Sequence, residues 1–263
     1  MNKRYVIALD LDDTLLNYEK KVSPKTKKIL TELEKKGNII IVVSGRIFDT
    51  CYETVSKLDF VRYMITDSGS IIYDKKDNKI ISKKKLKKET IKKILDLYND
   101  DMEYVEFSDE HYYYKYSKEK IEHYGLSKDI ENIQEFIKNH HAFHSTIKLK
   151  NYDHNKQLMN IIENDLGLHT FEMKNNDSDI KWIEIVRKDV SKYQAIKTVA
   201  KKEKISINNI ISFGDNYNDL DMLKKSKYGV AMGNAIEEVK KEAKLATKSC
   251  NEDGIAVFLR SFF

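Results

Sequence analysis

Short apolar runs alternate with helix-forming segments at the start of the chain, and this alternation limits the possible folds more than any other feature. Apolar, largely β-branched runs predict buried strands at 5–11, 38–43 and 63–66, and helical patterns separate them at 23–37 and about 47–58. Consecutive strands joined by helices form right-handed crossovers in a parallel sheet. We therefore predict an α/β fold with a doubly wound, Rossmann-like parallel sheet covered by helices on both faces.

The pattern changes in the middle of the chain, where predicted strands come in pairs. Between 82 and 188 the expected order is helix, strand, strand, helix, strand, helix, strand, strand, which indicates an α+β insert with an antiparallel sheet. The alternation of helix and strand resumes after residue 189. We therefore predict a core domain formed by 1–81 and 189–263, interrupted by an inserted α+β cap domain formed by 82–188.

The composition limits the kinds of partner. The chain is 41% hydrophobic and 34% charged, as in soluble globular proteins, and no apolar run approaches the roughly 20 residues that span a bilayer. The net charge of +5 suggests nucleic acid, but the basic and acidic residues are interleaved, and the lysine run at 83–88 leads into an amphipathic helix. Cys51 and Cys250 match no metal-ligand spacing and predict free thiols. We expect a cytoplasmic monomer or weak homodimer with no nucleic acid or membrane partner.

Residues just past the predicted strands are the informative ones, because open parallel sheets bind ligands beyond the carboxyl ends of their strands. Asp10, Asp12 and Asp13 follow the first strand. Such closely spaced acids repel one another unless a cation holds them, and their oxygens suit Mg²⁺. Of Asp10 and Asp12, one can attack phosphorus while the other handles the proton of the leaving group. A solvated acidic turn is the competing interpretation.

Two further clusters suit an anion. Ser44 and Gly45 follow the second strand, where a hydroxyl and backbone amides can bind a phosphoryl oxygen, although Ser-Gly is also a common turn. Lys192 opens a predicted helix at 191–203. A cation there opposes the helix dipole, so anchoring an anion explains it better than helix stability does, with a surface lysine as the alternative.

The fourth cluster is the most specific. The segment 214–222 follows the predicted strand 210–213 and carries acidic and amide side chains after a glycine. Asp215 is placed to complete a cation site, and Asn218 and Asp219 to orient its surroundings.

Taken in order at these strand ends, the four clusters resemble the haloacid dehalogenase (HAD) superfamily, in particular its Cof-type phosphatases. The resemblance covers nearly the whole chain, including the cap and the segments 230–235 and 251–256. It implies a Mg²⁺-dependent phosphatase that hydrolyses small phosphorylated metabolites through an aspartyl-phosphate. A phosphomutase of the same fold and a catalytically silent phosphosugar-binding regulator are the alternatives.

The resemblance also implies roles for individual residues. Asp10 is expected to be the nucleophile and a metal ligand, and Asp12 the general acid and base, which also lends its backbone carbonyl to the metal. The remaining expected roles are phosphate binding by Ser44, Gly45, Lys192 and Asn218, and metal binding or support by Asp215 and Asp219. Three residues depart from the family pattern: Asp13 and Tyr193 stand where glycine is usual, and Ser68 where asparagine is usual.

Two other features carry weaker signals. His140, His141 and His144 include an i, i+4 pair, but they lie where a helix is expected to pass into a strand, so a metal role is the weaker interpretation. The tyrosine-rich run 112–116 alternates along an expected strand, so that half of it packs on helices and half faces solvent or substrate.

Overall fold

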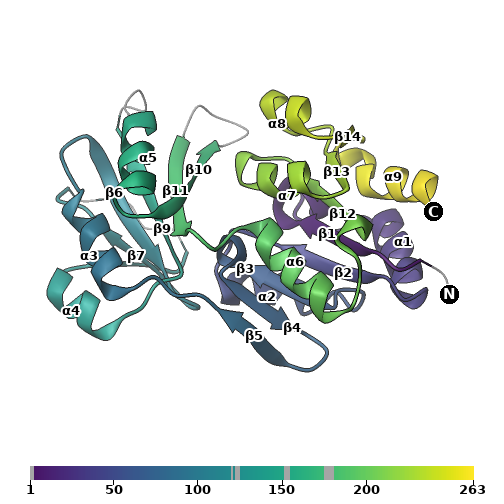
Figure 1. Cartoon of the computed structure of the whole chain (residues 1–263), viewed down its shortest axis with the longest axis horizontal. Coiled ribbons are helices and arrows are strands. Elements are labelled where there is room, and N and C mark those ends of the chain that lie inside the picture. Colours follow the sequence, from purple (N-terminus) through teal and green to yellow (C-terminus); the bar gives the residue numbers. More distant parts are fainter. Residues whose placement is uncertain (1–2, 120, 122–124, 151–154, 175–180) are drawn as a thin grey trace.

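The chain forms two β-sheets, each covered by helices and lying side by side (Figure 1). The computed structural model describes residues 3–119, 121, 125–150, 155–174 and 181–263. The chain crosses from the larger sheet to the smaller one after β5 (Lys79–Lys83) and returns after β11 (Lys181–Arg187), and both termini lie beside the larger sheet. The α/β fold class with an inserted α+β segment is therefore confirmed.

The larger sheet is parallel over its first six strands in spatial order and antiparallel at one edge. The sequence did not predict the antiparallel hairpin β4–β5. Most of β5 is exposed and lysine-rich, so the apolar signal of a buried strand is absent there. The spatial order is β14 (Leu245–Ala246), β13 (Tyr228–Ala231), β12 (Ile210–Gly214), β1 (Val6–Asp10), β2 (Ile39–Val43), β3 (Tyr63–Thr66), β4 (Ile71–Asp74), β5.

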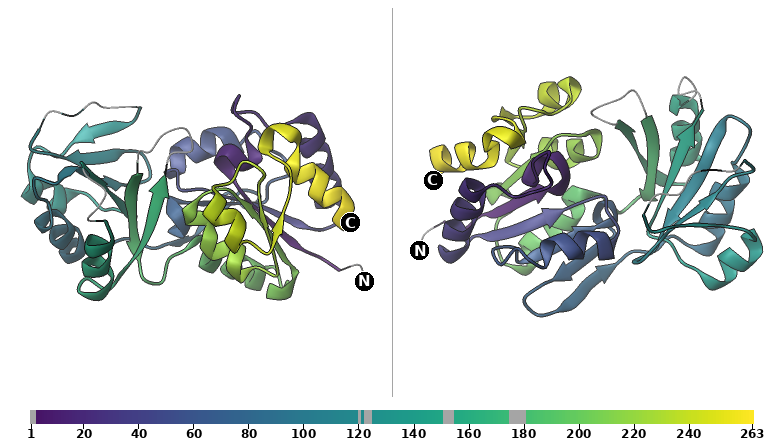
Figure 2. Two further views of the ribbon diagram at one scale, coloured as in Figure 1. Left: turned by 90° about the horizontal axis from the view of Figure 1, so that it is seen from above. Right: turned by 180° about the vertical axis from the view of Figure 1, so that it is seen from behind.

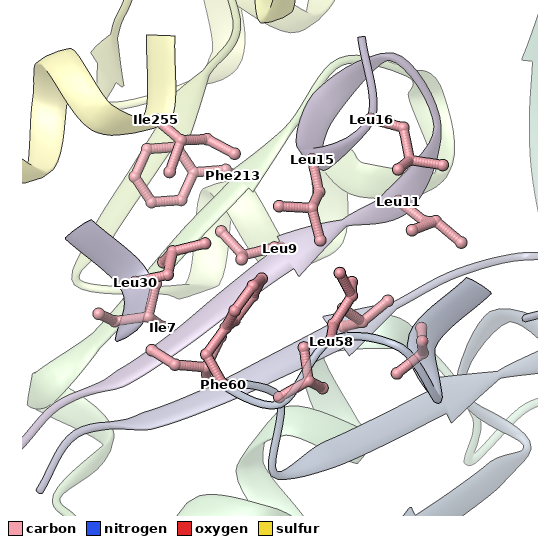
Figure 3. Packing of buried hydrophobic residues seen from close by; sticks show 14 of the residues in the cluster. Ile7, Leu9, Leu11, Leu15, Leu16, Leu30, Leu58, Phe60, Phe213 and Ile255 are labelled. Carbon is pink, nitrogen blue, oxygen red and sulfur yellow. The ribbon is translucent and has the colours of Figure 1, made fainter. Parts of the chain in front are cut away.

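Helices cover both faces of this sheet. Side chains of β1 alternate between the two faces, and every residue of β1 is buried, so neither face is exposed to solvent there. Ile7 and Leu9 pack with Leu30, Phe213 and Ile255 on one face (Figure 3). Val6 and Ala8 pack on the other face against α6 (Lys192–Lys202). The helices on the first face are α1 (Pro24–Lys35), α2 (Phe48–Val55) and α9 (Gly254–Phe262), and α7 (Leu220–Lys225) and α8 (Glu237–Glu242) complete this lobe.

The smaller sheet lies beside the larger one in both views of Figure 2. It is antiparallel apart from one parallel edge pair, β7 with β8. The short, half-exposed β8 was not predicted from the sequence. The spatial order is β10 (Leu168–Lys174), β11, β9 (His144–Leu149), β6 (Met102–Ser108), β7 (Tyr113–Tyr116), β8 (Ser127–Asp129), and the accompanying helices are α3 (Lys88–Asp96), α4 (Ile133–Asn139) and α5 (Asn155–Asn164).

The two faces of the smaller sheet differ in polarity. Val105, Phe107, Ile147 and Ile183 point to the face that packs against the three helices. Their neighbours in sequence point to the other face and are polar or aromatic, because side chains alternate along a strand. This polar face includes Tyr104, Glu106, Thr146, Trp182 and Glu184, which line one cavity with Gly45 and Arg46 of the larger sheet's lobe.

Other expectations have plain outcomes. The lysine run leads into α3, where Ile91, Ile94 and Leu95 form a buried apolar stripe, and Leu86, which precedes the helix, is buried as well. Both cysteines are free thiols. Within the described part of the chain, no helix is long and apolar enough to span a membrane. The domain limits at 81/82 and 188/189 stay a prediction, and β5 extends two residues past the first of them.

Candidate active site

Four predicted clusters lie at one edge of the larger sheet. β1 pairs in parallel with β2 on one side and β12 on the other, so that Asp10 is opposite Val43 and Leu9 is opposite Phe213. The next residues along these strands, Ser44 and Asp215, therefore come to the same edge as Asp10. Asp10, Ser44 and Asp215, with Gly45 and Asn218, line a cavity of about 260 Å³.

Lys192 is the cation of this site. It is 1% exposed at the start of α6, and its Nζ lies 2.6 Å from Asp10 Oδ1 and 2.6 Å from Asp219 Oδ1. Burial alone would lower the pKa of Lys192, but the two carboxylates outweigh it and raise the pKa above its ordinary value. The alternative of a surface lysine is therefore wrong, although the anions that Lys192 meets here are carboxylates of the protein itself.

Three carboxylates gather around this lysine. Within the described ranges, Asp10, Asp215 and Asp219 are the one group of potential metal ligands whose ligand atoms all lie within 4.8 Å of one another. Burial and the charge of Asp219 raise the pKa of Asp10 well above its ordinary value, with a smaller contribution from Asp215, although Lys192 acts in the opposite direction. The site thus holds more negative than positive charge.

Asp219 orients the loop that follows β12. Its Oδ2 accepts hydrogen bonds from the backbone N–H groups of Asp215 and Asn216, at 2.9 and 3.1 Å. Gly214 makes this close approach possible, because a Cβ at that position would lie 2.5 Å from the Cβ and Cγ of Asp219. Since Lys192 bonds the other oxygen, both oxygens of Asp219 already have partners.

Asp12 lies outside the carboxylate group and is held by Arg46. The guanidinium donates to both carboxylate oxygens, from Nε at 2.7 Å and from Nη2 at 2.6 Å, and Lys20 adds a contact at 3.3 Å. Burial alone would raise the pKa of Asp12, but Arg46 and Lys20 outweigh it and lower the pKa below its ordinary value. Asp12 is therefore held as a carboxylate. From the sequence, Arg46 was assigned no role and this contact was not predicted.

Polar atoms surround Gly45. A Cβ at this position would meet Glu184 Oε1 at 3.3 Å, Ser68 Oγ at 3.5 Å and Asn218 Nδ2 at 3.6 Å. Asn218 accepts a hydrogen bond from Lys192 through Oδ1, at 3.3 Å, which leaves its Nδ2 donor directed towards Gly45. The surroundings of Gly45 thus combine one N–H donor, the Asn218 amide, with a hydroxyl and a carboxylate oxygen.

The three departures from the family pattern have structural correlates. Asp13 and Ser68 have positive φ values of 55° and 51°, a region that glycine and asparagine favour. The side chain of Tyr193 packs in the core between the larger sheet and α6. The Ser68 hydroxyl donates a hydrogen bond of 2.8 Å to Glu184, a contact between the two sheets.

Glu184 and Trp182 line the same cavity as Asp10, and sequence reasoning assigned them no role. Both lie on β11, in the segment predicted as a strand. Side chains alternate along this strand, so the apolar Ile183 and Ile185 point to one face of the smaller sheet and Trp182 and Glu184 to the other. This alternation is the one sequence signal that the sheet has a polar face. Nothing in the sequence states that this face meets the larger sheet.

The histidines and tyrosines have other partners than metal. His144 lies 2.7 Å from Ser108 Oγ and 3.2 Å from Asp67, and the His141 ring contacts Glu110 at 2.7 Å. None of the three histidines belongs to a metal-like group among the residues described. Tyr112, Tyr114 and Tyr116 pack against the apolar core while Tyr113 and Lys115 line a cavity, as the alternation predicts.

Comparisons with known proteins agree on one family. The model of the haloacid dehalogenase-like hydrolases matches residues 7–259. A 5-amino-6-(5-phospho-D-ribitylamino)uracil phosphatase of Bacillus subtilis, YcsE, is 28% identical over 255 residues, which cover 97% of this chain and 94% of that protein. The structure of a haloacid dehalogenase-like hydrolase from B. subtilis aligns with a TM-score of 0.83 at 22% identity, covering 98% of this chain and all of the other. A haloalkanoate-superfamily phosphatase from Bacteroides thetaiotaomicron aligns with a TM-score of 0.84 at 20% identity, covering 99% of this chain and 95% of its own.

Proposed function

Because the chain belongs to the haloacid dehalogenase-like hydrolases, we propose that it is a Mg²⁺-dependent phosphatase of small phosphate monoesters. The observation that carries this proposal is the position of Asp10. Its carboxylate is 7% exposed, lines a cavity, and is held at 2.6 Å by the buried ammonium of Lys192. A carboxylate fixed in this way at the end of a central strand is suited to attack a bound phosphoryl group.

The donor set fits Mg²⁺. Asp10, Asp215 and Asp219 offer hard carboxylate oxygens, the ligands that Mg²⁺ prefers, and Lys192 pairs with Asp10 and Asp219. We propose Asp10, Asp215 and the backbone carbonyl of Asp12 as ligands, with Asp219 as their support because both its oxygens already accept hydrogen bonds. Bound Mg²⁺ would offset negative charge on Asp10 and on the transferring phosphoryl oxygens.

In the proposed reaction one oxygen of Asp10 attacks phosphorus and the bond to the leaving-group oxygen breaks. Ser44, the amide of Asn218 and Lys192 would hold the phosphoryl oxygens, and the leaving oxygen takes up a proton from Asp12. Water then attacks phosphorus, the Asp10–phosphate bond breaks, and Asp12 accepts the proton from water. Glycine at position 45 leaves room for the phosphoryl group beside these donors.

Asp12 suits the second step as it stands, because Arg46 holds it as a carboxylate. To act as an acid in the first step it must be protonated, which requires that the contact with Arg46 be weakened. Since Arg46 lines the same cavity, an incoming phosphoryl group is a natural competitor for its guanidinium.

The proposed substrates are small phosphorylated metabolites, with sugar and sugar-alcohol phosphates among them. The similarity to a ribitylaminouracil phosphatase supports this class, as do two adjoining cavities that residues of both lobes line. We further propose that the protein acts in the cytoplasm as a monomer or weak homodimer, without a nucleic acid partner.

The test measures the hydrolysis of p-nitrophenyl phosphate in the presence of Mg²⁺ and, separately, in the presence of excess chelator. Asp10→Asn keeps the shape of the side chain but removes its charge, so kcat should fall on the order of 10³-fold or more while the circular dichroism spectrum is unchanged. Asp96→Asn, the same change at an exposed site on α3, should keep full activity. Substantial turnover by folded Asp10→Asn, or full turnover in chelator, refutes the proposal.

A further inference from the structure

The polar face of the smaller sheet adjoins the phosphoryl site. It lines a second cavity of about 400 Å³ with Tyr104, Tyr113 and His144 among its walls. Glu184 and Trp182 line both this cavity and the one that contains Asp10. The organic part of a phosphate ester bound at Asp10 would therefore have space past Glu184, along this face.

Glu184 has one oxygen without a partner. The residue is 7% exposed, and its Oε2 accepts the hydrogen bond from Ser68. No donor in the described part of the chain hydrogen-bonds to Oε1, which lies 3.3 Å from the Cβ position of Gly45. Glu184 lines both cavities, so a group bound there can supply the hydrogen-bond donor that this charged oxygen accepts.

That donor cannot be a phosphoryl group. A phosphate ester is anionic, and the cavity already contains the carboxylates of Asp10, Asp12 and Asp215, so a further carboxylate opposes its binding. The donor must come from the organic part of the substrate, at a point close to the phosphoester. The remaining wall carries the hydroxyl, ammonium and carboxylate groups of Thr146, Lys148 and Glu106, which suits a neutral group rich in hydroxyls better than a charged one.

We propose that Glu184 determines specificity by accepting a hydrogen bond from a substrate hydroxyl on the carbon next to the one that bears the phosphoester. The proposal deepens the phosphatase function above and rests on it. Substrates with this hydroxyl, as in polyol phosphates, are then preferred over otherwise identical esters that lack it.

Ser68 is the positioning residue for Glu184. It lies in the loop after β3, where Asp67, Ser68 and Gly69 have φ values of 50°, 51° and 110°. A Cβ on Gly69 would lie 2.4 Å from the backbone oxygen of Ser191, so this loop packs against the start of the helix that carries Lys192. Such an unfavourable backbone persists where the surroundings fix it, and here it aims the Ser68 hydroxyl at β11.

The experiment compares two substrates, glycerol 3-phosphate and 3-hydroxypropyl phosphate, which differ only in the hydroxyl next to the ester-bearing carbon. The measured quantity is the ratio of kcat/KM for glycerol 3-phosphate to kcat/KM for 3-hydroxypropyl phosphate. A hydrogen bond to a charged acceptor corresponds to roughly 10- to 100-fold in kcat/KM, so this ratio should be about tenfold or more for the wild type. Glu184→Gln should lower the ratio at least about threefold, because the amide is a weaker acceptor. Ser68→Ala should lower it less. Glu89→Gln, the same change at an exposed site on α3, should keep the wild-type ratio.

Each outcome decides the matter. A wild-type ratio near one, or a wild-type ratio retained by both Glu184→Gln and Ser68→Ala, overturns the assignment of Glu184 while hydrolysis itself still supports the phosphatase function. A fall in the ratio in both variants and not in Glu89→Gln supports it. If Glu184→Gln does not fold, Ser68→Ala decides alone. Absence of hydrolysis of both esters and of p-nitrophenyl phosphate by the wild type overturns the proposed function, and this inference with it.

Discussion

Glu110 joins the two sheets, and replacing it should destabilise the protein in a pH-dependent way. It lies in the turn between β6 and β7, where its carboxylate contacts Lys83 Nζ at 2.5 Å and His141 Nε2 at 2.7 Å. Its backbone oxygen accepts a hydrogen bond from the N–H of Asp49 on α2. Lys83 ends β5 of the larger sheet, so the carboxylate connects elements of both sheets.

The pKa of Glu110 sets the size of the effect. Burial alone would raise this pKa, but the hydrogen bonds from Lys83 and His141 outweigh it and lower the pKa from 4.5 to about 2. At 1.36 kcal/mol per unit, the ionised group contributes at most about 3.4 kcal/mol to the free energy of unfolding. Because Lys83 and His141 are 33% and 38% exposed, solvent screens the interaction, and we expect Glu110→Gln to cost about 1–2 kcal/mol at pH 7.

The sign of the pH dependence follows from a depressed carboxyl pKa. The stabilisation is complete above pH 4.5, the ordinary pKa, and is lost as the pH falls from 4.5 towards 2. Urea unfolding of wild type and Glu110→Gln should therefore show a difference at pH 7 that shrinks by about two-fifths at pH 3.5. Glu237→Gln breaks an exposed pair with Lys240 and should change little at either pH. An equal cost at both pH values, or none at pH 7, refutes the reasoning.

Two more predictions follow from close contacts. Gly214→Ala forces Asp219 away from its present position and should cost about 1–3 kcal/mol in urea unfolding, whereas Gly45→Ala, which meets side-chain ends, should cost less; equal costs would contradict the geometry. Burial lowers the pKa of His144, but the hydrogen bond and charge of Asp67 outweigh it and raise the pKa above its ordinary value of 6.5. The melting temperature of the wild type minus that of His144→Gln should therefore be largest below pH 6.5 and decrease as the pH rises to 9. A difference that does not change with pH would refute this.

The sequence predicted the central strands and the edge of the sheet at which the candidate site residues meet, because both depend on local patterns. Buried strands such as β1 and β12 are continuous apolar runs, and parallel pairing brings the residues after them to one edge whatever the details of packing. Three of the strands that it missed, β5, β8 and β14, are short or exposed, so their residues carry little apolar signal. β4 is buried and largely apolar, so weak apolar signal does not explain why it was missed.

The partners of the site residues could not be predicted, because they depend on contacts across long sequence separations. From the sequence, Lys192 is a cation at the positive end of a helix dipole, which is unfavourable. Only the fold shows that two carboxylates lie next to it and offset this unfavourable interaction. The two hydrogen bonds from Arg46 to Asp12 join the loops after β1 and β2. The spacing of residues in the sequence does not determine the direction of side chains in such loops. Position was therefore predictable where charge state was not.

Under this proposal, substrate specificity depends on how the two sheets are placed relative to each other. The proposed nucleophile Asp10 and the proposed phosphoryl-binding groups Ser44 and Lys192 all belong to the larger sheet's lobe. Glu184 belongs to the smaller sheet and accepts a hydrogen bond from Ser68 of the larger sheet's lobe. A shift between the sheets lengthens the Ser68–Glu184 hydrogen bond and moves Oε1 away from Gly45 without altering the geometry around Asp10. Discrimination between leaving groups thus depends on contacts that hydrolysis itself does not need, so it can change through residues of either sheet while the phosphoryl chemistry is kept.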